Sequence, residues 1–382
     1  MPTATIATAS YRNHSPKRTC YPSEAIPARA VREPLSSIEA FPAERITKFP
    51  KLRFMGSKYR LLPWIHSVLL NLKFDTALDA FSGSSCVAYL LKAMGKCVTA
   101  NDFLQFPATI ARATVENANT LLVADDMQTL MGSNRAQRHF IERTFRGIFF
   151  TPADLRFLDR VSANVTRLAD PHKRDVALSA LIRACVKRQP RGVFTVAGDP
   201  DRYKDGRRDL KLSIEEHFLE QVAVYNRAVF ANGRPNRVLN QSVFDIRPSN
   251  YDLVYFDPPY VPRADDNCYV KRYHFLEGLA CYWEGVEILE HTRVKKLAKP
   301  YTPFSYRREA TEAIDSLFSR FRDSILVLSY SSNGYPDLPV IVELMRRHKD
   351  AVNVYETEHS YHFGTHAAVR RGRVREYLIV GT

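Results

Sequence analysis

The sequence predicts a doubly wound α/β fold that is interrupted by a mostly helical insertion. Three observations support this prediction. A short apolar strand, a loop of small residues, a helix and a second strand follow one another over residues 75–102, as in the opening unit of a doubly wound sheet. Segments with helical apolar spacing fill much of residues 121–235. A further apolar strand then ends in an aspartate and two prolines at 257–259.

The composition is that of a globular protein, and its basic charge is compatible with a nucleic-acid partner. The chain has 382 residues, 45% of them hydrophobic, and 55 Lys and Arg against 41 Asp and Glu give a net charge of +14. A basic excess of this size is typical of nucleic-acid binders, although it also aids solubility. No run of about 18 apolar residues appears, so we expect no membrane span. The 6 cysteines are scattered without a Cys-x-x-Cys pair, which favours a cytoplasmic location and argues against a metal site.

The expected elements divide the chain into three parts. Residues 1–45 lack sustained periodicity and predict a disordered tail. Two segments, 46–120 and 236–382, should build one sheet around the helical insertion of 121–235. In chain order we expect a helix at 61–72, a strand at 75–80, a helix at 86–94, and strands at 96–100, 237–239, 254–256, 325–329 and 376–380.

The loop AFSGSS, residues 80–85, follows the first strand and opens a helix. A small turn that contains glycine lets backbone N–H groups and the helix N-terminus approach a ligand. Asp102 ends the next strand, where an acidic side chain typically accepts hydrogen bonds from ribose hydroxyls. Taken alone, these features also fit an ordinary βα turn followed by a strand-terminal acid.

The segment DPPY, residues 257–260, follows a strand rich in aromatic and β-branched residues. Because tandem prolines end the strand, Asp257 lies at its carboxyl end, the edge where open α/β sheets bind ligands. Asp257 and the carbonyl of Pro258 could each accept one N–H of an exocyclic amine and so increase the electron density on its nitrogen. Pro259 stiffens the turn, and Tyr260 offers a flat face for an extruded base. The alternative is that Asp257 merely caps the turn.

DPPY after a hydrophobic strand resembles the catalytic motif of the amino-methyltransferases that use S-adenosylmethionine. Residues 51–58, KLRFMGSK, resemble the N-terminal motif of the Dam-type, α-group DNA adenine-N6 methyltransferases, and the order of the motifs agrees. The resemblance covers about residues 53–382 and implies a Rossmann-like class I methyltransferase sheet with a target-recognition insertion. Ser84 and Ser85 depart from the family, because a second glycine is usual there. The cofactor contacts that the resemblance implies are Phe54, Gly56, Lys58, Phe81, Gly83, Asp102, Phe244, Asp245 and Asp257.

The resemblance implies transfer of a methyl group to N6 of a flipped adenine in double-stranded DNA, in a restriction-modification or genome-methylation role. A monomer without a metal is expected, and a cognate restriction endonuclease is one partner that such a role implies. Cytosine-N4 methylation, RNA adenine methylation and a catalytically inactive DNA-binding module are the alternatives. Tyr273 and His274, downstream of DPPY, would either pack on a helix or lie near the base.

A basic segment within the insertion is the candidate DNA-binding surface. Its lysines and arginines would neutralise phosphates, and an arginine could reach guanine O6 and N7. Four aspartates between residues 199 and 209 interleave with them, so a self-paired, solvated loop is the alternative. The candidate residues are Lys187, Arg188, Arg191, Arg202, Arg207 and Arg208.

Overall fold

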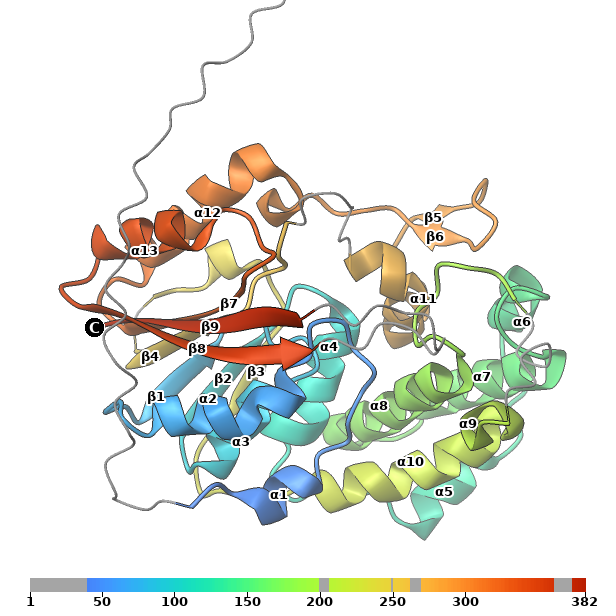
Figure 1. The fold of residues 1–382 in the computed structure, drawn as a ribbon. Helices are drawn as coiled ribbons and strands as arrows, with labels where there is room; N and C mark the ends of the chain where they lie inside the picture. The colour runs from blue at the N-terminus through green and yellow to red at the C-terminus, as the bar shows by residue number, and fades with distance from the viewer. Residues whose placement is uncertain (1–39, 199–205, 249, 262–268, 361–372) are drawn as a thin grey trace, which may run out of the picture. The chain divides into compact units, whose positions relative to one another are not determined.

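Within the residues that the structure describes, seven strands form one sheet in the order β3-β2-β1-β4-β7-β9-β8 (Figure 1). The structure is a computed structural model that describes residues 40–198, 206–248, 250–261, 269–360 and 373–382. The neighbouring strands run parallel except at β9, which lies antiparallel between β7 and β8. This mostly parallel sheet confirms the predicted α/β class. The strands are β1 (Thr76–Asp79), β2 (Cys97–Asn101), β3 (Arg237–Leu239), β4 (Leu253–Phe256), β7 (Ile325–Ser331), β8 (Val352–Ser360) and β9 (Arg373–Gly381).

The strand order reverses at β1, and this reversal determines where a ligand can bind. From β1 the chain passes through helix α3 (Cys86–Ala93) to β2 on one side, whereas β4 lies on the other side. The register pairs Asp79, the last residue of β1, with Ala100 of β2 and Tyr255 of β4. The carboxyl ends of three strands therefore meet at one edge, which is the ligand-binding edge of doubly wound sheets.

Helices cover both faces of the sheet. Successive residues of a strand point to opposite faces, so each strand contributes side chains to two hydrophobic cores. Ala77 and Leu253 belong to a core with α2 and α3, whereas Leu78 and Val254 belong to a core with α12 and α13. Figure 1 shows these two pairs of helices on opposite faces. Ile46 of α1 joins the core that contains α2. The bounds of these helices are α1 (Ala43–Thr47), α2 (Leu62–Leu69), α12 (Arg307–Arg320) and α13 (Leu338–Arg346).

The helices between β2 and β3 have clear local starting signals. Thr151 accepts a hydrogen bond from the N–H of Asp154 at the start of α7, and Asp170 caps α8 in the same way. Ser213 and Glu216 form a capping box at the start of α10. These caps satisfy N–H groups that the first turn of a helix leaves without partners. The helices are α5 (Ala124–Met131), α6 (Phe140–Phe145), α7 (Pro152–Val165), α8 (Pro171–Arg188), α9 (Arg208–Lys211) and α10 (Ile214–Ala228).

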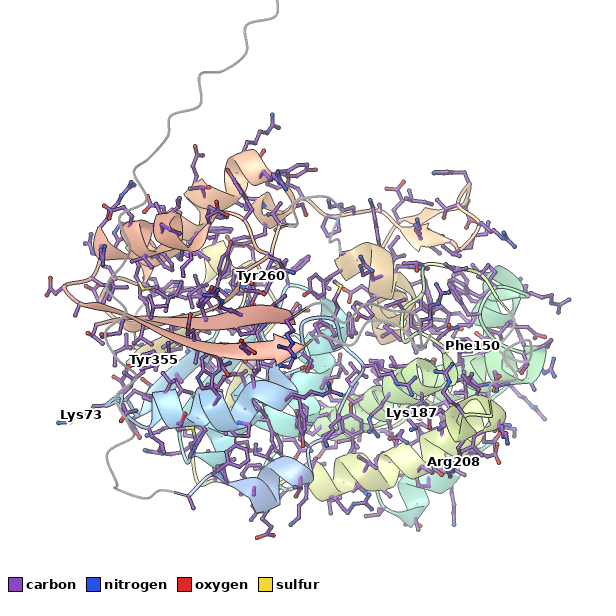
Figure 2. All side chains as sticks on the ribbon, in the orientation of Figure 1. Lys73, Phe150, Lys187, Arg208, Tyr260 and Tyr355 are labelled. Atoms are coloured by element: carbon purple, nitrogen blue, oxygen red, sulfur yellow. The ribbon has the colours of Figure 1, made fainter. Side chains whose placement is uncertain are left out.

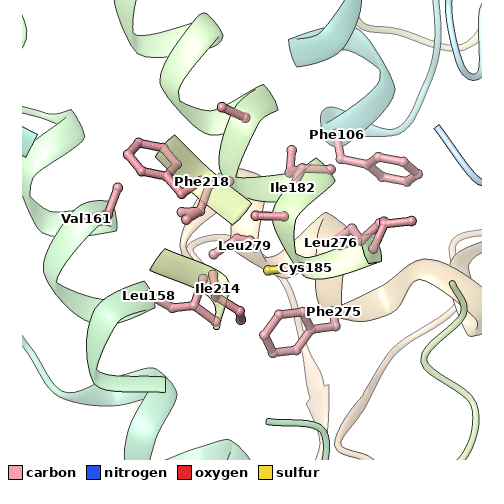
Figure 3. Packing of buried hydrophobic residues seen from close by; sticks show 14 of the residues in the cluster. Phe106, Leu158, Val161, Ile182, Cys185, Ile214, Phe218, Phe275, Leu276 and Leu279 are labelled. Carbon is pink, nitrogen blue, oxygen red and sulfur yellow. The ribbon is translucent and has the colours of Figure 1, made fainter. Parts of the chain in front are cut away.

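The hydrophobic core of this helical part extends beyond the predicted insertion of residues 121–235. Figure 3 shows Phe106 and Phe275 in the same buried cluster as Ile182 of α8. Elements outside the insertion thus complete its core and connect it to the edge of the sheet. These elements are α4 (Gln105–Ala111), α11 (Tyr269–Cys281) and the hairpin of β5 (Ile288–Leu289) and β6 (Lys296–Leu297).

The predicted strands correspond to β1, β2, β3, β4, β7 and β9, whereas β8, α12, α13 and the hairpin were not predicted. Of the predicted tail, residues 1–39 lie outside the described part, and α1 begins at Ala43. None of the helices in the described ranges is long and apolar enough to cross a membrane. Short helical turns complete the fold: η1 (Lys58–Leu61), the π-helix η2 (Arg112–Glu116), η4 (Val243–Asp245) and η5 (Pro303–Ser305).

Candidate active site

The carboxyl ends of β1, β2 and β4 border a pocket that is open to solvent. The N-terminal motif also contributes to its walls. Two of the predicted cofactor residues do not line this pocket: Asp245 is exposed, and Phe244 stacks on Phe304, whose ring meets Phe81 edge-on. Of the DPPY residues, Pro258 and Tyr260 do not line it either. The predicted residues that do line it are Phe54, Gly56, Lys58, Phe81, Gly83, Asp102, Asp257 and Pro259.

The loop after β1 needs residues that tolerate unusual backbone geometry. Gly83 has a φ of +48°, and a Cβ there would come within 3.0 Å of the Phe54 ring. Phe54 in turn stacks on Tyr273 at 5.1 Å. Ser85 keeps a left-handed φ of 64° although it is not glycine, a conformation that costs most residues roughly 1–2 kcal/mol. The serine-rich loop therefore retains a glycine-like backbone.

The carboxylate of Asp102 binds two backbone N–H groups in the wall of the pocket. One oxygen accepts the N–H of Gly83 at 2.9 Å, and the other accepts the N–H of Leu104 at 2.9 Å. Burial raises the pKa of Asp102 to about 6, against the hydrogen bonds from these backbone groups. Each oxygen has a second lone pair, so Asp102 can still accept a ligand hydroxyl.

Asp79 is a pocket residue that the sequence analysis missed. Its side chain is buried, and Oδ2 accepts the N–H of Ala88 at 3.0 Å. Oδ1 has no hydrogen-bond partner among the described residues. Burial, and then the charge of Asp257, raise the pKa of Asp79 to about 8. The only sequence signal for a role of Asp79 was its place as an acid at the end of an apolar strand, and this pattern also fits an ordinary strand end.

Lys58 joins the N-terminal motif to DPPY. Its side chain is 2% exposed, and Nζ lies 3.1 Å from Oδ1 of Asp257. Nζ also donates to the hydroxyl of Tyr260 at 3.0 Å, and this hydroxyl donates to Oδ1 of Asp257 at 3.0 Å. Glu376 of β9, another residue that the sequence analysis missed, has Oε2 3.8 Å from the same ammonium. The structure thus surrounds Lys58 with the motif acid and a second buried acid.

Asp257 keeps one carboxylate oxygen available for a ligand. Its side chain is 20% exposed, and Oδ2 accepts no hydrogen bond from the residues that the structure describes. Burial raises the pKa of Asp257, although the ion pair with Lys58 and the hydrogen bond from Tyr260 act against this rise. The Tyr260 ring meets Tyr330 edge-on at 5.2 Å, and stacking of a base on its face stays a prediction.

The predicted DNA-binding residues lie on the helical part, as Figure 2 shows for Lys187 and Arg208. Most of them bind other protein groups. Lys187 forms an ion pair of 2.8 Å with Asp209, Arg208 pairs with Glu220, and Arg207 donates to the carbonyl of Pro190 at 2.8 Å. Of the four aspartates in the self-paired alternative, Asp209 pairs with Lys187, whereas Asp199, Asp201 and Asp205 lie outside the described residues.

Arg188 and Arg191 are close in sequence, but the first is buried and the second is exposed. Arg188 is 5% exposed and binds Asp154 and the carbonyl of Leu210, so it braces the interior of the helical part. Arg191 is exposed and makes no ion pair within the described residues. Arg202 lies outside the described residues.

Tyr273 and His274 connect α11 to neighbouring segments. The hydroxyl of Tyr273 accepts the N–H of Met55 at 2.8 Å, and a ring nitrogen of His274 contacts the carbonyl of Phe194 at 2.8 Å. Both side chains are buried, which agrees with the packing interpretation. The N–H of Phe194 also donates to the carbonyl of Arg272 at 2.8 Å. Through these bonds α11 links the pocket to the segment that carries Arg191.

Comparisons with known proteins identify one family and two relatives. The family model described as D12 class N6 adenine-specific DNA methyltransferase matches residues 54–330. The chain is 28% identical over 328 residues to the Type II methyltransferase M2.HphI of Haemophilus parahaemolyticus, covering 82% of this chain and 93% of that protein. It is 20% identical over 353 residues to the modification methylase LlaI of Lactococcus lactis subsp. lactis, covering 86% of this chain and 54% of that protein.

Proposed function

Because the chain belongs to the D12 class N6 adenine-specific DNA methyltransferase family, we propose that it methylates adenine N6 at Asp257 with S-adenosylmethionine as the methyl donor. The observation that carries this proposal is the environment of Asp257 at the end of β4. One oxygen is held by Lys58 and Tyr260, and the other is directed to no described protein group. The cofactor pocket borders this carboxylate directly.

The pocket has side chains that suit the donor. Asp102 would accept hydrogen bonds from ribose hydroxyls, and the unpartnered Oδ1 of Asp79 would face a cationic group. The Phe54 ring closes the pocket over Gly83. When bound, S-adenosylmethionine supplies an electrophilic methyl group. Within the described residues no cluster of His, Cys, Asp and Glu could hold a metal ion.

Asp257 and Pro258 would orient the target amine. The free Oδ2 of Asp257 accepts one N–H, and the carbonyl of Pro258 accepts the other, which directs the nitrogen lone pair towards the incoming methyl group. Positive charge develops on N6 as it forms the new bond, and the carboxylate stabilises that charge. N6 then loses one proton, which Asp257 is placed to accept because burial raises its pKa.

The names of the two relatives support a role in restriction-modification, with double-stranded DNA as the substrate and a cognate endonuclease as a partner. Such an enzyme would act in the cytoplasm on the nucleoid. Expression in a host that lacks DNA methylation, followed by sequencing of modified bases, tests this proposal. We expect N6-methyladenine at one sequence motif. N4-methylcytosine, or modification of RNA alone, would contradict it.

Asp102 provides a test of the cofactor site. We expect Asp102→Ala to weaken S-adenosylmethionine binding by about 10- to 100-fold, since hydrogen bonds to a charged group contribute roughly 1.5–3 kcal/mol. Isothermal titration calorimetry measures the affinity, and Asp102→Asn should lose less because one acceptor remains. Asp75→Ala, at the amino end of the same strand pair, is the control. Unchanged affinity in Asp102→Ala would remove Asp102 from the cofactor site.

Arg191 is the sharpest test of the proposed DNA surface, because it forms no ion pair with any residue in the described part of the chain. If it contacts a phosphate, Arg191→Ala should weaken binding to cognate and random duplexes alike and reduce the salt slope by about 1. If it reads a base, the variant should lose about 1–3 kcal/mol on the cognate duplex only.

The matched control is Arg234→Ala, because Arg234 pairs with Asp75 at the amino end of the sheet. Lys187→Ala, Arg207→Ala and Arg208→Ala extend the test to cations that already have protein partners. If Arg191→Ala, Lys187→Ala, Arg207→Ala and Arg208→Ala all keep the wild-type salt slope and affinity for DNA, this surface does not contact DNA.

A further inference from the structure

The carboxylate of Asp209 binds two cations from distant parts of the chain. Its Oδ2 accepts a hydrogen bond from Nη2 of Arg53 at 2.7 Å, and its Oδ1 accepts one from Nζ of Lys187 at 2.8 Å. Arg53 belongs to the N-terminal motif, whereas Lys187 lies in the last turn of α8 and Asp209 lies in α9. The side chains of Arg53, Lys187 and Asp209 are 43%, 22% and 21% exposed, so a ligand from solution can reach them.

This arrangement is the one that a phosphodiester group would need. A phosphate of the DNA backbone presents two anionic oxygens, as a carboxylate does, and arginine and lysine bind both groups through short charge-assisted hydrogen bonds. Partial burial raises the pKa of Asp209, but the hydrogen bond and charge of Lys187 and the charge of Arg53 lower that pKa below its ordinary value, so Asp209 is ionised at neutral pH. Arg53 and Lys187 therefore already converge on one anionic group.

Arg53 also connects the pocket with the exposed Arg191. Arg53 precedes Phe54, whose ring lines the pocket beside Gly83. A Cβ at Gly192 would come within 3.1 Å of the Cβ of Arg53, so the segment that carries Arg191 packs against Arg53. A base that is extruded into a pocket stays joined to its backbone, and the phosphates next to it must lie near the mouth of that pocket. Arg53 is placed to bind one of them.

We propose that Arg53 and Lys187 form a binding site for one phosphate of the DNA backbone, and that Asp209 occupies this site until DNA displaces it. The inference rests on the proposed function, in which duplex DNA is the substrate. The carboxylate competes with the phosphate for the same two cations, so it weakens binding to a duplex of any sequence. Base contacts then contribute a larger share of the affinity, which favours the cognate site.

The variant Asp209→Asn keeps the size of the side chain and removes the competing charge. We expect it to bind a fluorescent duplex of random sequence at least about threefold more tightly than the wild type, because the phosphate no longer meets a like charge. The plot of log affinity against log salt concentration should become steeper by about 1, since both cations are then available to neutralise phosphate. Fluorescence anisotropy at several salt concentrations measures both quantities.

A second set of variants tests whether the gain depends on the two cations. The double variant Arg53→Ala/Lys187→Ala should bind the same duplex more weakly than the wild type. Adding Asp209→Asn to this double variant should restore little affinity, because the site that the carboxylate occupied is gone. Wild-type affinity in the double variant, or the full gain from Asp209→Asn in its absence of both cations, would overturn the inference.

The matched control is Asp75→Asn, the same exchange in an aspartate that pairs with Arg234 at the amino end of the sheet. It changes the net charge by the same amount, so an equal gain in Asp75→Asn would assign the effect to overall charge and overturn the inference. Unchanged or weaker binding by Asp209→Asn would overturn it as well, since the carboxylate would then not compete with DNA.

The wild type separates this inference from the proposed function. If the wild type binds no DNA duplex, both fail together. If the wild type binds and methylates DNA while Asp209→Asn has the same affinity and salt slope, only the phosphate site fails.

Discussion

We expect Asp257→Ala to abolish methyl transfer to adenine, with a loss of at least about 1,000-fold in the single-turnover rate. The variant removes the carboxylate that accepts the amine proton and stabilises the developing charge on N6. The affinity for S-adenosylmethionine should change by less than about threefold, because Asp257 mainly addresses the target base. Transfer of a labelled methyl group to a cognate duplex measures the rate, and Asp323→Ala, at an exposed aspartate before β7, is the control.

Substantial turnover by Asp257→Ala would contradict the catalytic assignment. Asp257→Asn should be severely impaired, but less than Asp257→Ala, since its carbonyl oxygen can still accept one hydrogen bond.

The rate of methyl transfer by the wild type should rise with pH, because the amine needs the ionised carboxylate. Since burial raises the pKa of Asp257, this rise should occur at a higher pH than an ordinary aspartate would give. In Asp257→Asn the rise should disappear.

Lys58→Met should reduce both stability and turnover. Removing the ammonium breaks its ion pair with Asp257, and breaking such a buried pair costs about 3–5 kcal/mol of unfolding free energy. The single-turnover rate should fall as well, because Asp257 loses one of the two groups that hold its Oδ1. Urea denaturation and the labelled-methyl assay measure the two effects, with Lys73→Met, at an exposed lysine labelled in Figure 2, as the control.

The stability deficit of Lys58→Met should depend on pH in a defined direction. Without Lys58 the pKa of Asp257 in the folded state lies further above its unfolded value, because the ion pair that lowers it is lost, so the variant binds more protons when folded. Its stability is then fully present below the unfolded pKa and is lost as the pH rises through the folded pKa. The difference in unfolding free energy between Lys58→Met and the wild type should therefore grow as the pH rises. A variant as stable and active as the wild type at all pH values would show that Lys58 does not hold this site.

The local sequence determined the elements and the edge at which the site lies. The apolar strands 75–80 and 254–256, the loop 80–85 and the tandem prolines each carry their signal within a few residues, because periodicity, turn geometry and the loss of a backbone donor are local properties. Asp102 and Asp257 were therefore identified as strand-terminal acids, and the structure places both at one pocket. The helical insertion was identified for the same reason, since its caps and apolar spacing are contiguous in the chain.

Tertiary structure alone decided which of these groups act on one another. Lys58 was predicted to contact the cofactor, yet its ammonium binds Asp257 and Tyr260 as well as lining the pocket. Glu376 belongs to a strand whose antiparallel position gives no signal in the local sequence, and only the register of β9 brings it to Lys58.

The division between buried and exposed arginines was likewise a tertiary result. Arg188 and Arg191 belong to one basic segment, but the core of α8 and α10 buries the first and leaves the second at the surface. The sequence by itself determined which residues could carry charge and where strands would end. Pairing of charges across the chain depended on strand register and on burial, because both arise from contacts between segments that are far apart in the sequence and leave no local periodicity.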